Sequence, residues 1–183
     1  MKPQQNLKIA LTAVAILWLV NFLNLMLPIE LRVYGIRPRN PSGLLGIVCS
    51  PFLHADLRHL IANTSALFVL LLVTLSFSRK LAFTAVLIII ALGGGLVWLF
   101  GAANTIHIGA SGVIFGLIGF LMFIGVFRRE WIALTVSVVI FIFYGGALLS
   151  LLVVVPGVSW SGHFFGFISG ALAAMWTKAK KGK

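Results

Sequence analysis

The chain has 183 residues, of which 61% are hydrophobic and 9% are charged, and its mean hydropathy is +1.13. This composition excludes a soluble globular domain and is typical of a protein that crosses a membrane several times. The net charge of +11 would suit a nucleic-acid-binding protein, but the basic residues stand at the ends of hydrophobic runs, as membrane topology predicts. We therefore expect lipid around the chain and no nucleic-acid partner.

Six hydrophobic runs predict six transmembrane helices, because about 20 apolar residues cross the hydrocarbon core. They cover residues 7–27, 53–77, 81–101, 110–127, 131–155 and 158–177. The first run has a basic start like a signal peptide, but it is long, contains Asn21 and Asn24 and lacks a small-residue cleavage site. We expect it to be retained as a span. The prediction is an all-α membrane protein with a single domain over residues 1–183 and no separate soluble domain.

The segment between the first two spans, residues 28–52, contains both arginines and apolar residues such as Leu44 and Leu45. We therefore expect it to lie partly in the membrane interface. Its proline and glycine content argues against one continuous helix. In the fifth predicted span, Tyr144-Gly145-Gly146 is expected to be a weak point of the helix, as is Pro156-Gly157 in the following loop.

The distribution of lysine and arginine predicts the orientation. Ten basic residues fall on the side of the two termini and four on the other. The positive-inside rule therefore places both termini in the cytoplasm. Spans two, four and six then begin on the outer side, and His59, Ser111 and His163 would share the outer leaflet region.

Ser111 and His163 are the first candidates for chemistry, because a polar or ionisable group inside a span is costly unless it faces protein or water. A serine hydroxyl is a weak nucleophile until a neighbouring base takes its proton, and histidine titrates near neutrality. The patterns Gly112-x-x-x-Gly116 and Gly166-x-x-x-Gly170 would let the two helices approach closely. We expect this approach to bring Ser111 within hydrogen-bond reach of His163.

Stabilisation of an oxyanion would complete such a site. His59 and Asn63 are four residues apart and share a helix face, and Asn63 is the better hydrogen-bond donor. The backbone N–H of Ser111, in the first turn of its helix, is a second candidate donor. The three carboxylates, Glu30, Asp56 and Glu130, are poorly placed for a third catalytic member, so a Ser-His dyad is the simpler proposal.

Three motifs in chain order resemble the rhomboid intramembrane serine proteases. They are His59-x-x-x-Asn63 on the second span, Gly109-x-Ser111-Gly112 opening the fourth, and His163-x-x-Gly166-x-x-x-Gly170 on the sixth. The resemblance covers the six-helix core and implies a rhomboid-like bundle. It implies Ser111 as the nucleophile, His163 as the general base, and His59, Asn63 and the Ser111 amide around the oxyanion.

The same resemblance implies site-shaping roles for Gly109, Gly112, Gly166 and Gly170. The chain departs from the family at two places. Many bacterial rhomboids carry a Trp-Arg pair in the first loop, and this loop has Arg32, Arg37 and Arg39 but no tryptophan. Where such enzymes often have a tyrosine four residues after the nucleophile, this chain has Phe115, which keeps a ring that could stack on the histidine.

The predicted function is therefore cleavage of transmembrane protein substrates by a serine endopeptidase, with no cofactor and no metal site. The resemblance to the compact bacterial enzymes of this family implies a bacterial inner membrane. Two alternatives stay open: an inactive rhomboid-like scaffold that binds membrane clients, and a small transporter. The transporter is disfavoured because the polar residues cluster towards one side of the membrane. His54 and His107 are expected to be interfacial or loop histidines.

Overall fold

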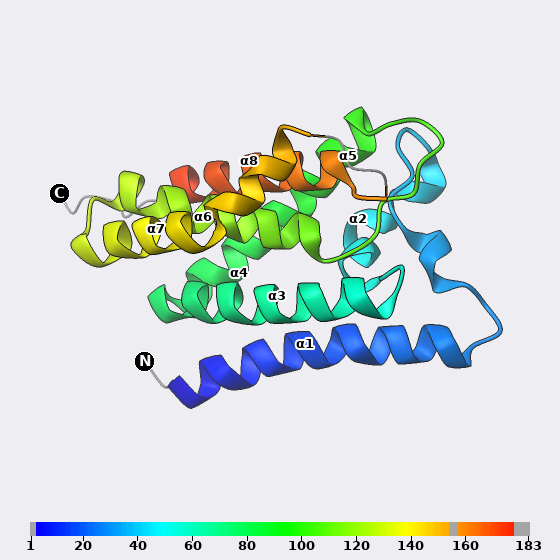
Figure 1. Cartoon of the computed structure of the whole chain (residues 1–183), viewed down its shortest axis with the longest axis horizontal. Coiled ribbons are helices and arrows are strands. Elements are labelled where there is room, and N and C mark those ends of the chain that lie inside the picture. Colours follow the sequence, from blue (N-terminus) through cyan, green and yellow to red (C-terminus); the bar gives the residue numbers. More distant parts are fainter. Residues whose placement is uncertain (1–2, 154–156, 178–183) are drawn as a thin grey trace.

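The structure, a computed structural model, describes residues 3–153 and 157–177. Within these residues it consists of helices and connecting loops, with a single isolated β-bridge between Ile36 and His107. The helices pack side by side as an elongated bundle (Figure 1). The prediction of an all-helical protein is confirmed for this part of the chain.

The long helices are α1 (Pro3–Met26), α3 (Leu57–Phe77), α4 (Arg79–Ile88), α6 (Ser111–Arg128), α7 (Trp131–Tyr144) and α8 (Trp160–Trp176). Helix α4 continues through a π-helical segment, η4 (Ile89–Gly93), into α5 (Gly94–Phe100). Helix α7 continues as the 3₁₀ helix η5 (Gly145–Leu151). The first loop contains four short helical pieces, η1 (Leu31–Tyr34), η2 (Pro41–Gly43), α2 (Gly46–Cys49) and η3 (Ser50–Phe52).

Five helical segments in the described residues are long and apolar enough to cross a membrane, namely Pro3–Met26, Leu57–Phe77, Arg79–Phe100, Ser111–Arg128 and Trp131–Leu151. Helix α8 has 17 residues, so it is shorter than any of these. The molecule is thus a multi-span helical protein. A sixth crossing by α8 remains a prediction, and so does the cytoplasmic location of the termini.

Most predicted span boundaries differ from the helix ends by a few residues, and two of the differences have local reasons. Helix α3 begins at Leu57 rather than at residue 53, because Asp56 caps it: its carboxylate accepts the N–H of His59 at 2.8 Å. The α-helical part of the fifth run ends at Tyr144, where the two glycines begin the 3₁₀ segment. The predicted end of that run, at residue 155, lies outside the described residues.

Helix α6 forms the centre of the bundle. Its side chains at Leu117, Phe120 and Leu121 are fully buried. By contrast, α7 exposes most of its large apolar side chains, including Trp131, which is 85% exposed. Such a surface is stable only in contact with lipid or another apolar partner. Helix α6 is therefore the inner helix of the bundle, and α7 lies at its surface.

The chain direction places the polar candidates together. Helix α1 begins and α8 ends at one end of the bundle, and α3, α6 and α8 all begin at the opposite end (Figure 1). Since His59, Ser111 and His163 lie in the first turns of these three helices, they lie at the same end of the bundle.

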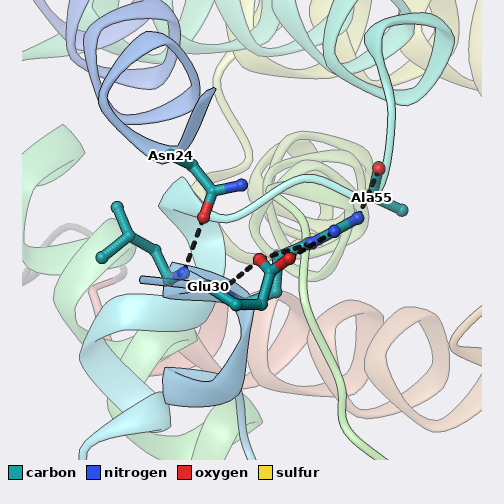
Figure 2. Close-up of polar contacts among 5 residues, drawn as sticks. Asn24, Glu30 and Ala55 are labelled. Atoms are coloured by element: carbon teal, nitrogen blue, oxygen red, sulfur yellow. Dashed lines mark hydrogen bonds and ion pairs between the residues drawn. The ribbon is translucent and has the colours of Figure 1, made fainter. Parts of the chain in front are cut away.

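The first loop is held against the bundle by arginine side chains. Arg39 donates hydrogen bonds to the carbonyls of Leu99 and Gly101, at 3.0 and 2.8 Å. Arg32 pairs with Glu30 and also donates to the carbonyl of Ala55 at 2.8 Å, as Figure 2 shows. Hydrogen bonding from Arg32 lowers the pKa of Glu30 to about 2. Arg39 thus ties the loop to the end of α5, and Arg32 ties it to the segment that precedes α3.

Candidate active site

Helix α6 begins at Ser111, so the serine occupies the first helical position. Gly109, two residues earlier, has φ of +110°, a conformation that L side chains rarely adopt. Its N–H donates to the carbonyl of Ser50 at 2.9 Å, which fixes the turn against the first loop. The N–H groups of the first helical turn have no intrahelical partner, so the positive end of α6 lies at Ser111.

His163 lies in the first turn of α8. Its backbone N–H donates to the carbonyl of Ser159 at 3.0 Å, and the Ser159 hydroxyl oxygen accepts the N–H of Gly162 at 3.1 Å. The imidazole is buried, with 8% of the residue exposed. The phenyl ring of Phe115 stacks on it at 4.0 Å between centroids, and Nδ1 lies 3.5 Å from Ser150 Oγ.

Helices α6 and α8 touch through glycines. A Cβ atom added at Gly166 would overlap the carbonyl oxygen of Gly112, and one added at Gly170 would overlap that of Gly116. A Cβ added at Gly112 would lie 3.4 Å from the carbonyl oxygen of Gly162. The two backbones are therefore closer than any side chain would allow, and the close approach that the glycine pattern predicts is present.

A cavity of about 620 Å³ opens beside these helix starts. The residues that line it include Ser111, His163, His59, Asn63 and Phe115. The structure thus brings the predicted site residues of three helices to one cavity. The hydrogen bonds within residues 3–153 and 157–177 do not include one between Ser111 and His163. The two side chains share the cavity without being joined.

Asn63 and His59 lie next to the turn before Ser111. A Cβ added at Gly109 would be 2.6 Å from Cε1 of the His59 ring and 3.5 Å from Nδ2 of Asn63. Asn63 is 6% exposed, and its Nδ2 has no hydrogen-bond partner among the described residues. A buried amide without an acceptor is costly, so this N–H group is suited to a ligand oxygen entering the cavity.

His54 and His107 make contacts that the sequence did not predict. His54 lies in the loop before α3, as expected, but it is only 3% exposed, and its ring centroid lies 5.1 Å from that of His59. Burial, together with the neighbouring His59, lowers the pKa of His54 to about 4. His107 also lies in a loop, as expected, and its imidazole bridges Thr105 and Ser159. The spacing of five residues between His54 and His59 carried no signal for this pairing.

Metal-ligating groupings of three or more His, Cys, Asp or Glu side chains do not occur among the residues that the structure describes. The serine, histidine and amide groups of the cavity are instead those of nucleophilic and acid–base chemistry. Fold and cavity together define a helical membrane protein with a cavity at one end of the bundle whose lining includes serine, histidine and asparagine side chains.

Comparison with known proteins identifies the class more closely. The family model described as Rhomboid domain matches residues 41–180. A Mycobacterium tuberculosis protein, named as uncharacterized, is 42% identical over 94% of this chain and 75% of its own length. A Mycobacterium leprae protein, also named as uncharacterized, is 39% identical over 94% of this chain and 72% of its own length. The Bacillus subtilis "Putative rhomboid protease YdcA" is 31% identical over 70% of this chain and 65% of its own length.

The chain belongs to the rhomboid family, as its motifs indicated. Membership agrees with a multi-span membrane location and suggests an intramembrane protease. The most similar relatives named here are uncharacterized, so they assign no activity to it.

Proposed function

We propose that this protein is an intramembrane serine endopeptidase that cleaves membrane-anchored proteins with Ser111 as the nucleophile and His163 as the general base. The observation that carries the proposal is the common cavity, which is lined by both residues and by Asn63. In the proposed reaction, His163 takes the hydroxyl proton, Ser111 attacks the peptide carbonyl, and the leaving amine receives the proton. Water then hydrolyses the acyl-enzyme.

The surroundings support this division of roles. Nδ1 of His163 faces Ser150 at 3.5 Å, so we assign the base role to Nε2. Asn63 Nδ2 and the Ser111 N–H are the proposed oxyanion donors, and the positive end of α6 favours negative charge at the same place. His59, in contact with the Gly109 turn, is proposed to line the oxyanion position.

In apo structures, catalytic hydrogen bonds are often long or unaligned and form only with substrate. The proposal therefore expects the Ser111–His163 hydrogen bond to form when a substrate strand occupies the cavity. Substrates are proposed to be transmembrane segments of other proteins, and the location a bacterial inner membrane with both termini in the cytoplasm.

Purified protein in liposomes, incubated with a transmembrane reporter and with a fluorophosphonate probe, tests the proposal. Cleavage and labelling are expected in the wild type, both lost in Ser111→Ala, and cleavage lost in His163→Ala. Ser76→Ala, a change of the same type at an exposed position on α3, serves as the matched control. Cleavage that persists in Ser111→Ala would contradict the assigned nucleophile. A folded wild type that neither cuts nor labels would favour the client-binding scaffold.

A further inference from the structure

His107 is the one histidine that links the loop before Ser111 to the start of the helix that carries His163. Its backbone pairs with that of Ile36 in both directions, at 3.0 and 2.9 Å. Its side chain spans two loops: Nε2 lies 2.8 Å from Thr105 Oγ1, and Nδ1 lies 2.7 Å from Ser159 Oγ. His107, Thr105 and Ser159 all line the cavity that contains Ser111 and His163.

The direction of each hydrogen bond follows from the chemistry of the groups. Thr105 Oγ1 donates its only hydrogen to the carbonyl of Ala102 at 2.6 Å, so towards His107 it must accept. Nε2 of His107 is therefore the protonated nitrogen, and Nδ1 of the neutral ring is an acceptor. Ser159 then donates its hydrogen to Nδ1 while its oxygen accepts the N–H of Gly162.

The result is one directed chain of hydrogen bonds: from the Gly162 N–H through Ser159, His107 and Thr105 to the carbonyl of Ala102. Every group in it uses its donor and acceptor in the neutral form of His107, and burial lowers the pKa of His107, which favours that form. The Ser159 end of the chain caps α8 only four residues before His163. The other end lies in the loop that leads to Gly109 and Ser111.

We propose that His107 is a positioning residue that acts through Ser159 to hold the start of α8, and with it His163, at a defined distance from Ser111. The expected effect on catalysis rests on the proposed proteolytic function, whereas the contact between His107 and Ser159 does not depend on it. A nucleophile and base that belong to different helices react efficiently only when their separation is fixed within a fraction of an ångström. Since the described parts of the chain show no hydrogen bond between these two side chains, a link between the two helix starts supplies that constraint.

The kinetic test compares variants in the liposome cleavage assay. His107→Leu removes both ring contacts, whereas His107→Asn keeps an acceptor near the position of Nδ1. We expect kcat to fall about tenfold in His107→Leu and in Ser159→Ala with little change in KM, because positioning rather than binding is lost. His107→Asn and Ser159→Thr should recover most of the rate.

The double variant His107→Leu with Ser159→Ala should be no slower than either single variant, because both interrupt the same chain. Wild-type kcat in His107→Leu, or no recovery in His107→Asn, would overturn the proposal. Ser76→Ala again controls for the loss of a hydroxyl elsewhere.

A second measurement does not depend on activity. In the Ser111→Ala background, imidazole nitrogen NMR of the four histidines should show His107 as the Nε2–H tautomer. The ring resonances of His163 should shift in His107→Leu and stay in place in His107→Asn. Unchanged His163 resonances in His107→Leu would exclude the positioning role, even if the wild type cleaves every reporter. If the wild type cleaves nothing while these shifts are seen, only the proposed function fails.

Discussion

The phenyl ring of Phe115 lies parallel to the imidazole ring of His163, with 4.0 Å between the ring centroids and 11° between the ring planes. Phe115 is one helical turn after Ser111 on α6, and His163 is on α8, so the contact joins the two helices beside the cavity. The aromatic face limits rotation of the imidazole. We therefore expect packing against this ring to orient the proposed base.

Replacement of Phe115 should reduce turnover more than stability. An aromatic pair contributes about 0.5–1.5 kcal/mol, so its loss in Phe115→Leu should lower kcat roughly threefold to tenfold if it orients His163. Phe115→Tyr keeps the ring and should cleave at nearly the wild-type rate. Reporter cleavage and thermal unfolding are measured on the same preparations. Equal rates in Phe115→Leu and wild type would show that the ring does not orient the base.

The contact between α6 and α8 should tolerate no side chain at Gly170. In Gly170→Ala the new Cβ would meet the backbone of Gly116 and Phe120, which cannot move as a side-chain end can. We expect a loss of unfolding free energy of about 1–3 kcal/mol, measured by denaturation in detergent micelles.

Gly95→Ala is the matched control for Gly170→Ala, because Gly95 is also helical and an added Cβ there meets nothing within 4 Å. It should be neutral or stabilising, since alanine is the better helix former. If both variants have the same stability, the two helices separate more easily than the structure implies.

The turn before Ser111 should depend on glycine for two separate reasons. Gly109→Ala would strain a backbone with φ of +110° and would push a methyl group into the His59 ring. We expect at least a tenfold loss of fluorophosphonate labelling, because the same turn sets the position of Ser111. Gly157→Ala shares the positive φ, of 79°, but meets nothing within 4 Å, so it reports backbone strain alone. Labelling in Gly109→Ala equal to that in Gly157→Ala would exclude the contact with His59 as the cause.

Stability should fall as the pH is lowered through the range set by His54. The folded protein protonates His54 only near pH 4, whereas the unfolded chain does so near the ordinary value of 6.5. The unfolded state therefore binds more protons between these values, and acidification favours unfolding by up to about 3 kcal/mol, fully expressed below pH 4.

His54→Leu should flatten this pH dependence of the unfolding free energy without abolishing it, because burial also lowers the pKa of His107. Denaturation at a series of pH values between 4 and 7 measures the difference between the two proteins. Parallel curves for wild type and His54→Leu would mean that His54 is not kept neutral by the fold.

Several features could be predicted from the sequence because they depend on local chemistry. A helix needs a long apolar run to cross a bilayer, so the runs predicted the helices to within a few residues at most boundaries. The two glycines after Tyr144 predicted a weak point, and the α-helix ends there. The motifs of α3, α6 and α8 identified the family. The start of α3 was placed too early because the cap by Asp56 competes with the apolar pattern at residue 53.

Other features depend on contacts between distant segments and had no local signal. The burial of His54 follows from the packing of the first loop, and the bridge from His107 to Ser159 spans 52 residues. The absence of a direct hydrogen bond between Ser111 and His163, within the described parts of the chain, was also not predictable. The glycine spacing predicted that the helices approach, not how the side chains meet across the gap.

The sequence by itself determined a rhomboid-family helical membrane protein and the residue types at its candidate site, because span length, glycine spacing and motif order are properties of the chain. Only the tertiary structure decided that His54 is buried beside His59, and that His107 connects the starts of the two helices. Those relationships depend on how each helix is rotated and shifted along its axis. Close packing between helices, such as that of Gly170 against the backbone of Gly116, sets both, and no local sequence pattern encodes them.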